Sequence, residues 1–187
     1  RCAEAGGALG AGFHVHTAEG PEDQALTLAM SPGGGGPGAA GGPGGAGGRR
    51  IVHRFDQFGL WNPKSLAVHC VHIDEGEMEA LAARGAAAVH NPQSNMGNAV
   101  GAAPVLEMAR RGVRVGLGTD GYTYDMFESL KAASVLHRHV AGDPQAGWAE
   151  VQQMAFAGNA AILAEHWPET RLGVLAPGSY ADMIALD

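Results

Sequence analysis

Residues 113–121 have the sequence Val-Arg-Val-Gly-Leu-Gly-Thr-Asp-Gly, in which a short apolar run ends in an acidic residue. A run of this length, bounded by glycine, is typical of a strand buried on both faces of a parallel sheet. Three other runs share this character, at residues 12–18, 65–71 and 86–90. The sequence therefore predicts four parallel strands.

Helical patterns follow these runs, at residues 50–58, 74–84, 103–111, 125–140 and 148–166. Asp74 stands at an N-cap position with Glu77 at the capping-box position, and Asp125 stands at a second N-cap. Strands that alternate with helices predict right-handed βα crossovers and an α/β fold.

Each predicted strand ends in side chains that can bind a metal or move a proton. These are His16 with Glu19, His69, His90 with Asn91, and Asp120. In a (β/α)₈ barrel the active site lies at the carboxyl ends of the strands. Four strands that end this way indicate a functional cluster.

Taken singly, these residues carry little specificity. A His-x-x-Glu pair is more often a surface turn than a catalytic motif, and an aspartate before glycine is most often a turn residue. His69 and His72 lie on opposite faces of one strand, so we expect only one of them to point into a site. We assign structural or surface roles to His53, His90 and His137.

Composition narrows the class of protein. The chain has 187 residues and a net charge of −7, which argues against a nucleic-acid partner. Its two cysteines, Cys2 and Cys70, form no CxxC motif and suggest a reducing compartment, so we expect a cytoplasmic protein. No apolar run approaches the roughly 18 residues of a membrane span, and no signal peptide is visible. Because the first residue is Arg1, we expect the natural N-terminus to be missing.

Residues 31–49 stand apart from the rest of the chain. Residues 33–48 contain 11 glycines in 16 positions, with prolines interspersed. Such a segment has too little apolar surface to offset its chain entropy, so we expect a disordered insert. It interrupts a helical connection and does not mark a domain boundary.

Four motifs together resemble the amidohydrolase superfamily, and in particular its cytosine-deaminase-like and chlorohydrolase-like branch. They are His14-Val-His-Thr-Ala-Glu19, Val68-His-Cys-Val-His-Ile73, His90-Asn-Pro-Gln-Ser-Asn-Met96 and Gly116-Leu-Gly-Thr-Asp-Gly121. Residues 94–101 and 118–128 look most like SsnA-type aminohydrolases. Residues 175–187 are similar to the return of such chains to a small β-domain.

The resemblance implies one divalent metal ion, zinc in most members. His16 and Asp120 would be its ligands, Glu19 would shuttle protons, and His69 would hydrogen-bond the attacking water or the substrate. Asp120 would also help to deprotonate that water. Zinc suits this chemistry because it lowers the pKa of bound water to about 7.

One departure from the family pattern shapes the fold prediction. Members of the family carry a His-x-His pair on strand one, whereas His14-x-His16 is the only such pair on a predicted strand here and fits strand five. We therefore expect an α/β chain that forms strands five to eight of a (β/α)₈ TIM-like barrel. Residues 1–166 would be the partial barrel, and residues 167–187 the start of the β-domain. Alone, such a chain should be unstable and inactive, and its open edges leave homo-oligomerisation as an alternative.

The expected function of the intact protein is hydrolysis of a non-peptide C–N bond in an amidine-like or heterocyclic small molecule, by deamination. Two alternatives remain open: release of another leaving group such as chloride, and an inactive truncated fragment. The zinc nucleobase deaminases with cysteine ligands are disfavoured, because the chain lacks their P-C-x-x-C pair. Tyr122 and Tyr124 are candidates for lining a substrate pocket.

Overall fold

The computed structural model describes residues 1–30, 49–181 and 183–185. The predicted insert falls almost entirely on residues 31–48, which lie outside the described residues. The strands are β1 (His14–Thr17), β2 (Leu66–His69), β3 (Ala87–His90) and β4 (Arg114–Leu117). They form one parallel sheet in the order β1-β2-β3-β4. The prediction of four parallel strands is confirmed, and each strand is shorter than its apolar run.

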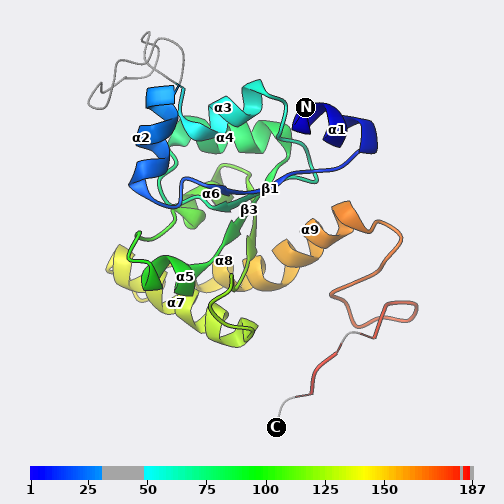
Figure 1. Ribbon diagram of the computed structural model, residues 1–187. Helices are drawn as coiled ribbons and strands as arrows, with labels where there is room; N and C mark the ends of the chain where they lie inside the picture. Colours follow the sequence, from blue (N-terminus) through cyan, green and yellow to red (C-terminus); the bar gives the residue numbers. More distant parts are fainter. Residues whose placement is uncertain (31–48, 182, 186–187) are drawn as a thin grey trace.

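Helices connect and cover these strands. In chain order they are α1 (Cys2–Leu9), α2 (Pro21–Met30), α3 (Ile51–Gln57), α4 (Glu75–Arg84), α5 (Pro92–Gly97), α6 (Val105–Arg110), α7 (Met126–Ala141), α8 (Trp148–Gln153), the π-helix η1 (Met154–Gly158) and α9 (Asn159–His166). In Figure 1, α2, α3 and α4 lie on one side of the strands, and α5, α7 and α8 lie on the other. No described helix is both long and apolar enough to cross a membrane.

The helix ends follow the predicted capping chemistry. The Asp74 carboxylate accepts from the Glu77 N–H at 2.9 Å, and the Glu77 carboxylate accepts from the Asp74 N–H at 3.1 Å, which completes a capping box. The Asp125 carboxylate accepts from the first-turn N–H groups of α7. Both N-caps are confirmed.

Three helical features differ from the sequence prediction. A single helix was expected over residues 148–166, but a π-helical turn at Met154–Gly158 divides it into α8 and α9. No helix was predicted between residues 90 and 103, yet α5 lies there and begins with Pro92 in its first turn. α1 was not predicted, because its eight residues lack a strong amphipathic pattern. Short helices carry too little periodicity to be recognised.

Small residues let the helices approach the sheet closely. Ala67, Ala87 and Ala88 are buried in the strands, and Leu81 and Met108 are the largest fully buried apolar side chains. At the open edge of β4, the side-chain amide of Asn159 bonds both the N–H and the carbonyl of Leu117, each at 2.9 Å. The amide thus satisfies backbone groups that a neighbouring strand would otherwise pair.

A buried carboxylate joins α2, α3 and α4. Glu77 is fully buried and accepts from Gln24 Nε2 at 2.9 Å, from Arg50 Nε at 2.8 Å and from the Val52 N–H at 3.0 Å. Gln24 precedes residues 31–48 and Arg50 follows them. Both flanks of that segment are therefore fixed to the same residue of α4.

Candidate functional site

The carboxyl end of the sheet brings together the four predicted site residues. His16 is in β1 and His69 ends β2, where Thr17 and His69 are register partners. The His16 and His69 ring centroids are 5.2 Å apart. His69 Nε2 lies 3.5 Å from Glu19 Oε2 and 3.8 Å from Asp120 Oδ2. Side chains from the ends of β1 and β4 thus converge on the imidazole at the end of β2.

The backbone is strained at these strand ends. His69 has φ 72°, Cys70 has φ 53° and Asp120 has φ 54°, and Ala18, just before Glu19, has φ 50°. Residues other than glycine adopt such values rarely, and each costs on the order of 1–3 kcal/mol. Strain of this kind gathers at functional sites, where the surroundings hold a side chain in a required direction.

Helix α5 and its C-cap residue, Asn98, contact the three residues predicted to be catalytic. Ser94 Oγ donates to Asp120 Oδ2 at 2.6 Å, and Asn98 Nδ2 donates to Glu19 Oε1 at 3.1 Å. Asn95 Oδ1 lies 2.8 Å from His69 Nδ1.

The sequence analysis did not identify Ser94, Asn95 or Asn98 as part of the site. Ser94 and Asn95 lie in the motif at residues 90–96 and Asn98 follows it, but no local signal tells which of these polar side chains reach other strand ends. Only the fold places residues of one short helix and its C-cap against three separate strand ends.

The environment of Asp120 favours its ionised form. The hydrogen bond from Ser94 lowers the pKa of Asp120 below its usual value, and the Gly121 N–H, which donates at 2.6 Å, acts in the same direction. The nearby rings of His69 and His16 add a smaller effect of the same sign. Asp120 is therefore a carboxylate near neutral pH, the form that binds a metal ion.

The remaining histidines lie outside this cluster. His72, which lies just beyond β2, bonds the Val100 carbonyl through its Nε2 at 2.9 Å. Of His69 and His72, it is therefore His69 that faces the site. His90 and His137 are buried and bond each other through their Nε2 atoms at 3.1 Å. Burial, the neighbouring His137 and then His69 lower the pKa of His90 to about 3. His90 is thus neutral near pH 7, and its structural role stays a prediction.

His16 and Asp120 have the donor chemistry that zinc prefers, an imidazole nitrogen and a carboxylate oxygen. Zinc sites with a catalytic role usually have three protein ligands. Among the residues that the structure describes, no group of three or more His, Cys, Asp or Glu side chains is arranged to hold a metal ion. The two residues fit part of a zinc site, and a complete one requires further ligands.

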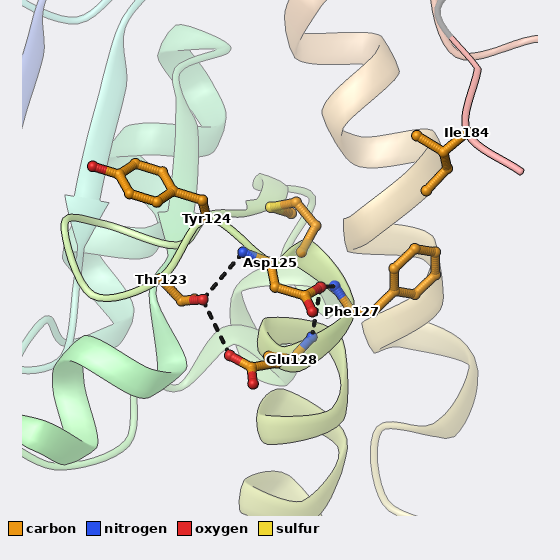
Figure 2. Close-up of a pocket in the computed structure, with 7 residues that line it drawn as sticks. Thr123, Tyr124, Asp125, Phe127, Glu128 and Ile184 are labelled. Carbon is orange, nitrogen blue, oxygen red and sulfur yellow. Dashed lines mark hydrogen bonds between the residues drawn. The ribbon is translucent and has the colours of Figure 1, made fainter. Parts of the chain in front are cut away.

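A hollow of about 660 Å³ lies beyond Asp120, along the loop between β4 and α7 (Figure 2). Figure 2 shows Thr123, Tyr124, Phe127 and Ile184 around it, and the Asp125 carboxylate turned toward the first turn of α7. Tyr124 is 98% exposed. Tyr122 is not among the lining residues, and its ring packs near Gly97 at the end of α5.

The sequence model of the amidohydrolase family matches residues 3–187. The chain belongs to the amidohydrolase family. This amidohydrolase chain is 39% identical over 183 residues to a 5′-deoxyadenosine deaminase of Methanosarcina mazei, a match that covers 95% of this chain and 38% of the relative. It is 38% identical over 192 residues to a 5-methylthioadenosine/S-adenosylhomocysteine deaminase of Nitratidesulfovibrio vulgaris, covering 100% and 39% of the two chains.

Solved structures give the same family fold. The chain superposes on an adenosine deaminase of Xanthomonas campestris with bound zinc at a TM-score of 0.77 and 29% identity, covering 96% of this chain and 38% of that one. It also superposes on a mutant of the atrazine chlorohydrolase TrzN of Arthrobacter aurescens at a TM-score of 0.70 and 23% identity, covering 96% of this chain and 36% of that one, a likeness of fold alone. The amidohydrolase chain therefore spans less than half the length of these relatives.

Proposed function

We propose that the intact protein containing this chain is a zinc-dependent deaminase of adenine nucleosides modified at the 5′ position. The convergence of Glu19 and Asp120 on His69, with His16 beside it, carries the proposal. The substrate class is taken from the relatives named as 5′-deoxyadenosine and 5-methylthioadenosine/S-adenosylhomocysteine deaminases. The sequence prediction of C–N bond hydrolysis agrees with this class.

His16 and Asp120 would hold the zinc ion together with ligands outside this chain. When bound, zinc supplies Lewis-acid chemistry that makes water a nucleophile at neutral pH. The hydrogen bond from Ser94 holds the Asp120 carboxylate in place at 2.6 Å. Ser94 therefore orients a proposed ligand as well as favouring its charged form.

The proton transfers are assigned to Glu19. In the reaction, the water oxygen bonds to the amine-bearing ring carbon, the C–N bond breaks, and ammonia leaves with a proton from the water. A carboxylate suits both transfers because it can accept the proton and then deliver it to the leaving nitrogen. Glu19 is partly exposed and is held by Asn98, so it can reach a substrate at this edge of the sheet.

The finer architecture belongs to the same proposal. We assign β1 to β4 to strands five to eight of the barrel, residues 1–166 to the partial barrel, and residues 167–187 to the return toward a β-domain. The described part of residues 167–187 contains no helix or strand, so the β-domain stays a prediction, as does the likeness to SsnA-type aminohydrolases. On this assignment the chain alone lacks the ligands of strand one.

Glu19→Gln in the intact protein tests the proposed function. We expect the turnover rate with 5′-deoxyadenosine or 5′-methylthioadenosine, measured as ammonia release, to fall by at least about 100-fold. This is the lower end of the effect expected for loss of a general acid–base group. Glu22→Gln is the matched control, because Glu22 is an exposed acid on α2 and should leave turnover unchanged. Normal turnover in Glu19→Gln would refute the assigned role.

Release of chloride from a related ring is the second candidate reaction. Assaying the wild-type protein with a chlorinated purine or triazine beside the nucleosides separates the two, since each leaving group is measured directly. Elemental analysis provides an independent check: we expect about one zinc per intact protein.

A further inference from the structure

Asn95 and His69 form a buried pair at the centre of the site. Asn95 is fully buried and His69 is 1% exposed, so neither side chain can exchange its partner for water. As the amide is placed, its oxygen Oδ1 lies 2.8 Å from His69 Nδ1. The opposite ring nitrogen, Nε2, faces the carboxylates of Glu19 and Asp120 at 3.5 Å and 3.8 Å.

The direction of the Asn95 amide decides which ring nitrogen of His69 carries the proton. A neutral imidazole has one N–H and one bare nitrogen, and a hydrogen bond at one nitrogen fixes the state of the other. If the amide oxygen accepts from Nδ1–H, the bare Nε2 turns its lone pair toward two carboxylate oxygens. The amide nitrogen then has no hydrogen-bond partner among the described residues, although it is buried.

The opposite direction removes both conflicts. The two ends of a side-chain amide have the same shape, so hydrogen bonding determines which end faces a neighbour. With the amide nitrogen toward His69, an N–H of Asn95 donates to Nδ1, and Nε2–H points at the carboxylates. The amide oxygen is then left without a donor, and buried carbonyl oxygens go unpaired more often than buried N–H groups.

We propose that Asn95 is a positioning residue that donates to His69 Nδ1 and holds the imidazole in its Nε2–H tautomer. The inference rests on the proposed function for its catalytic meaning. His69 then presents a proton to the space between Glu19 and Asp120, where a substrate nitrogen or the attacking water can accept it. Ser94 in α5 and Asn98 at its C-cap hold the two carboxylates, so this helix and its cap orient all three groups.

Nitrogen NMR of the intact protein, labelled with ¹⁵N-histidine and carrying its metal as purified, tests the tautomer directly. A bare imidazole nitrogen resonates far downfield of a protonated one, and a His69→Gln variant assigns the signals. We expect Nδ1 to be bare and Nε2 protonated in the wild type. A bare Nε2, or two protonated nitrogens, would overturn the proposal.

Asn95→Asp provides the second arm, because a carboxylate of the same shape can only accept a hydrogen bond. We expect Nδ1 of His69 to become protonated, and turnover to fall on the order of 10–100-fold as for other residues that orient a site histidine. Asn62→Asp is the matched control: Asn62 bonds the Ala11 carbonyl and the Lys64 N–H at the opposite end of the sheet, and the His69 signals should not change.

Unchanged His69 signals in Asn95→Asp would show that Asn95 does not set the tautomer. If Asn95→Asp fails to fold, the wild-type spectrum alone shows whether His69 has the proposed tautomer. If the wild type shows the predicted tautomer but no deamination, the proposed function fails while the positioning role of Asn95 stands.

Discussion

Removing the Glu77 carboxylate should destabilise the protein more than any surface change nearby. In Glu77→Ala the Val52 N–H, which is buried, loses its acceptor, and Arg50 keeps only Asp74 as a charged partner at 2.7 Å. Gln24 retains two bonds, since its Nε2 donates to the His72 carbonyl and its Oε1 accepts from the Ile51 N–H. Breaking a buried charged pair from one side typically costs about 3–5 kcal/mol. The unpaired N–H costs about 1–3 kcal/mol, and the lost capping box costs about 1 kcal/mol. These two losses account for much of the expected destabilisation.

Urea unfolding of the intact protein, followed by circular dichroism, measures this loss. With a slope of about 2–3 kcal/mol per molar urea, the midpoint should fall by about 1–2 M. Glu79→Ala is the matched control on the same helix, because Glu79 is 69% exposed and pairs with Arg111 at 3.0 Å. An exposed pair is worth about 0–1 kcal/mol. A Glu77→Ala midpoint no lower than that of Glu79→Ala would refute the argument.

Two further predictions concern titratable groups away from the metal ligands. The pKa of His90 is lowered to about 3 in the folded state, against about 6.5 unfolded, so its stabilising contribution is complete above pH 6.5. We expect that contribution to be lost as pH falls from 6.5 toward 3, at up to about 1.4 kcal/mol per pH unit. In His90→Gln the urea midpoint should therefore depend less steeply on pH across that range. An unchanged dependence of the urea midpoint on pH in His90→Gln would contradict this prediction. Burial raises the pKa of the Cys70 thiol. Iodoacetamide should therefore label the exposed Cys2 in the native protein and leave Cys70 unmodified, which mass spectrometry would show. Equal labelling of the two cysteines would contradict this prediction.

The strands and caps could be predicted because their signals are local. An apolar run such as residues 113–118 specifies a buried strand by its own composition, and Asp74 and Glu77 form a capping box within one turn. The same locality explains the failures. The π-helical turn at Met154–Gly158 lies against β4, and nothing in its own residues distinguishes it from an α-helix.

By itself, the sequence determined that His16, Glu19, His69 and Asp120 stand at strand ends, because parallel strands bring their carboxyl ends to one edge. Only the tertiary structure decided that His69 and not His72 faces the site, since the left-handed backbone at His69 and Cys70 changes the alternation expected of a strand. The tertiary structure also decided that α5 and its C-cap residue hold all three proposed catalytic groups. Ser94, Asn95 and Asn98 bond residues 26, 26 and 79 positions away, and contacts across such separations depend on how the chain packs, which no local pattern encodes.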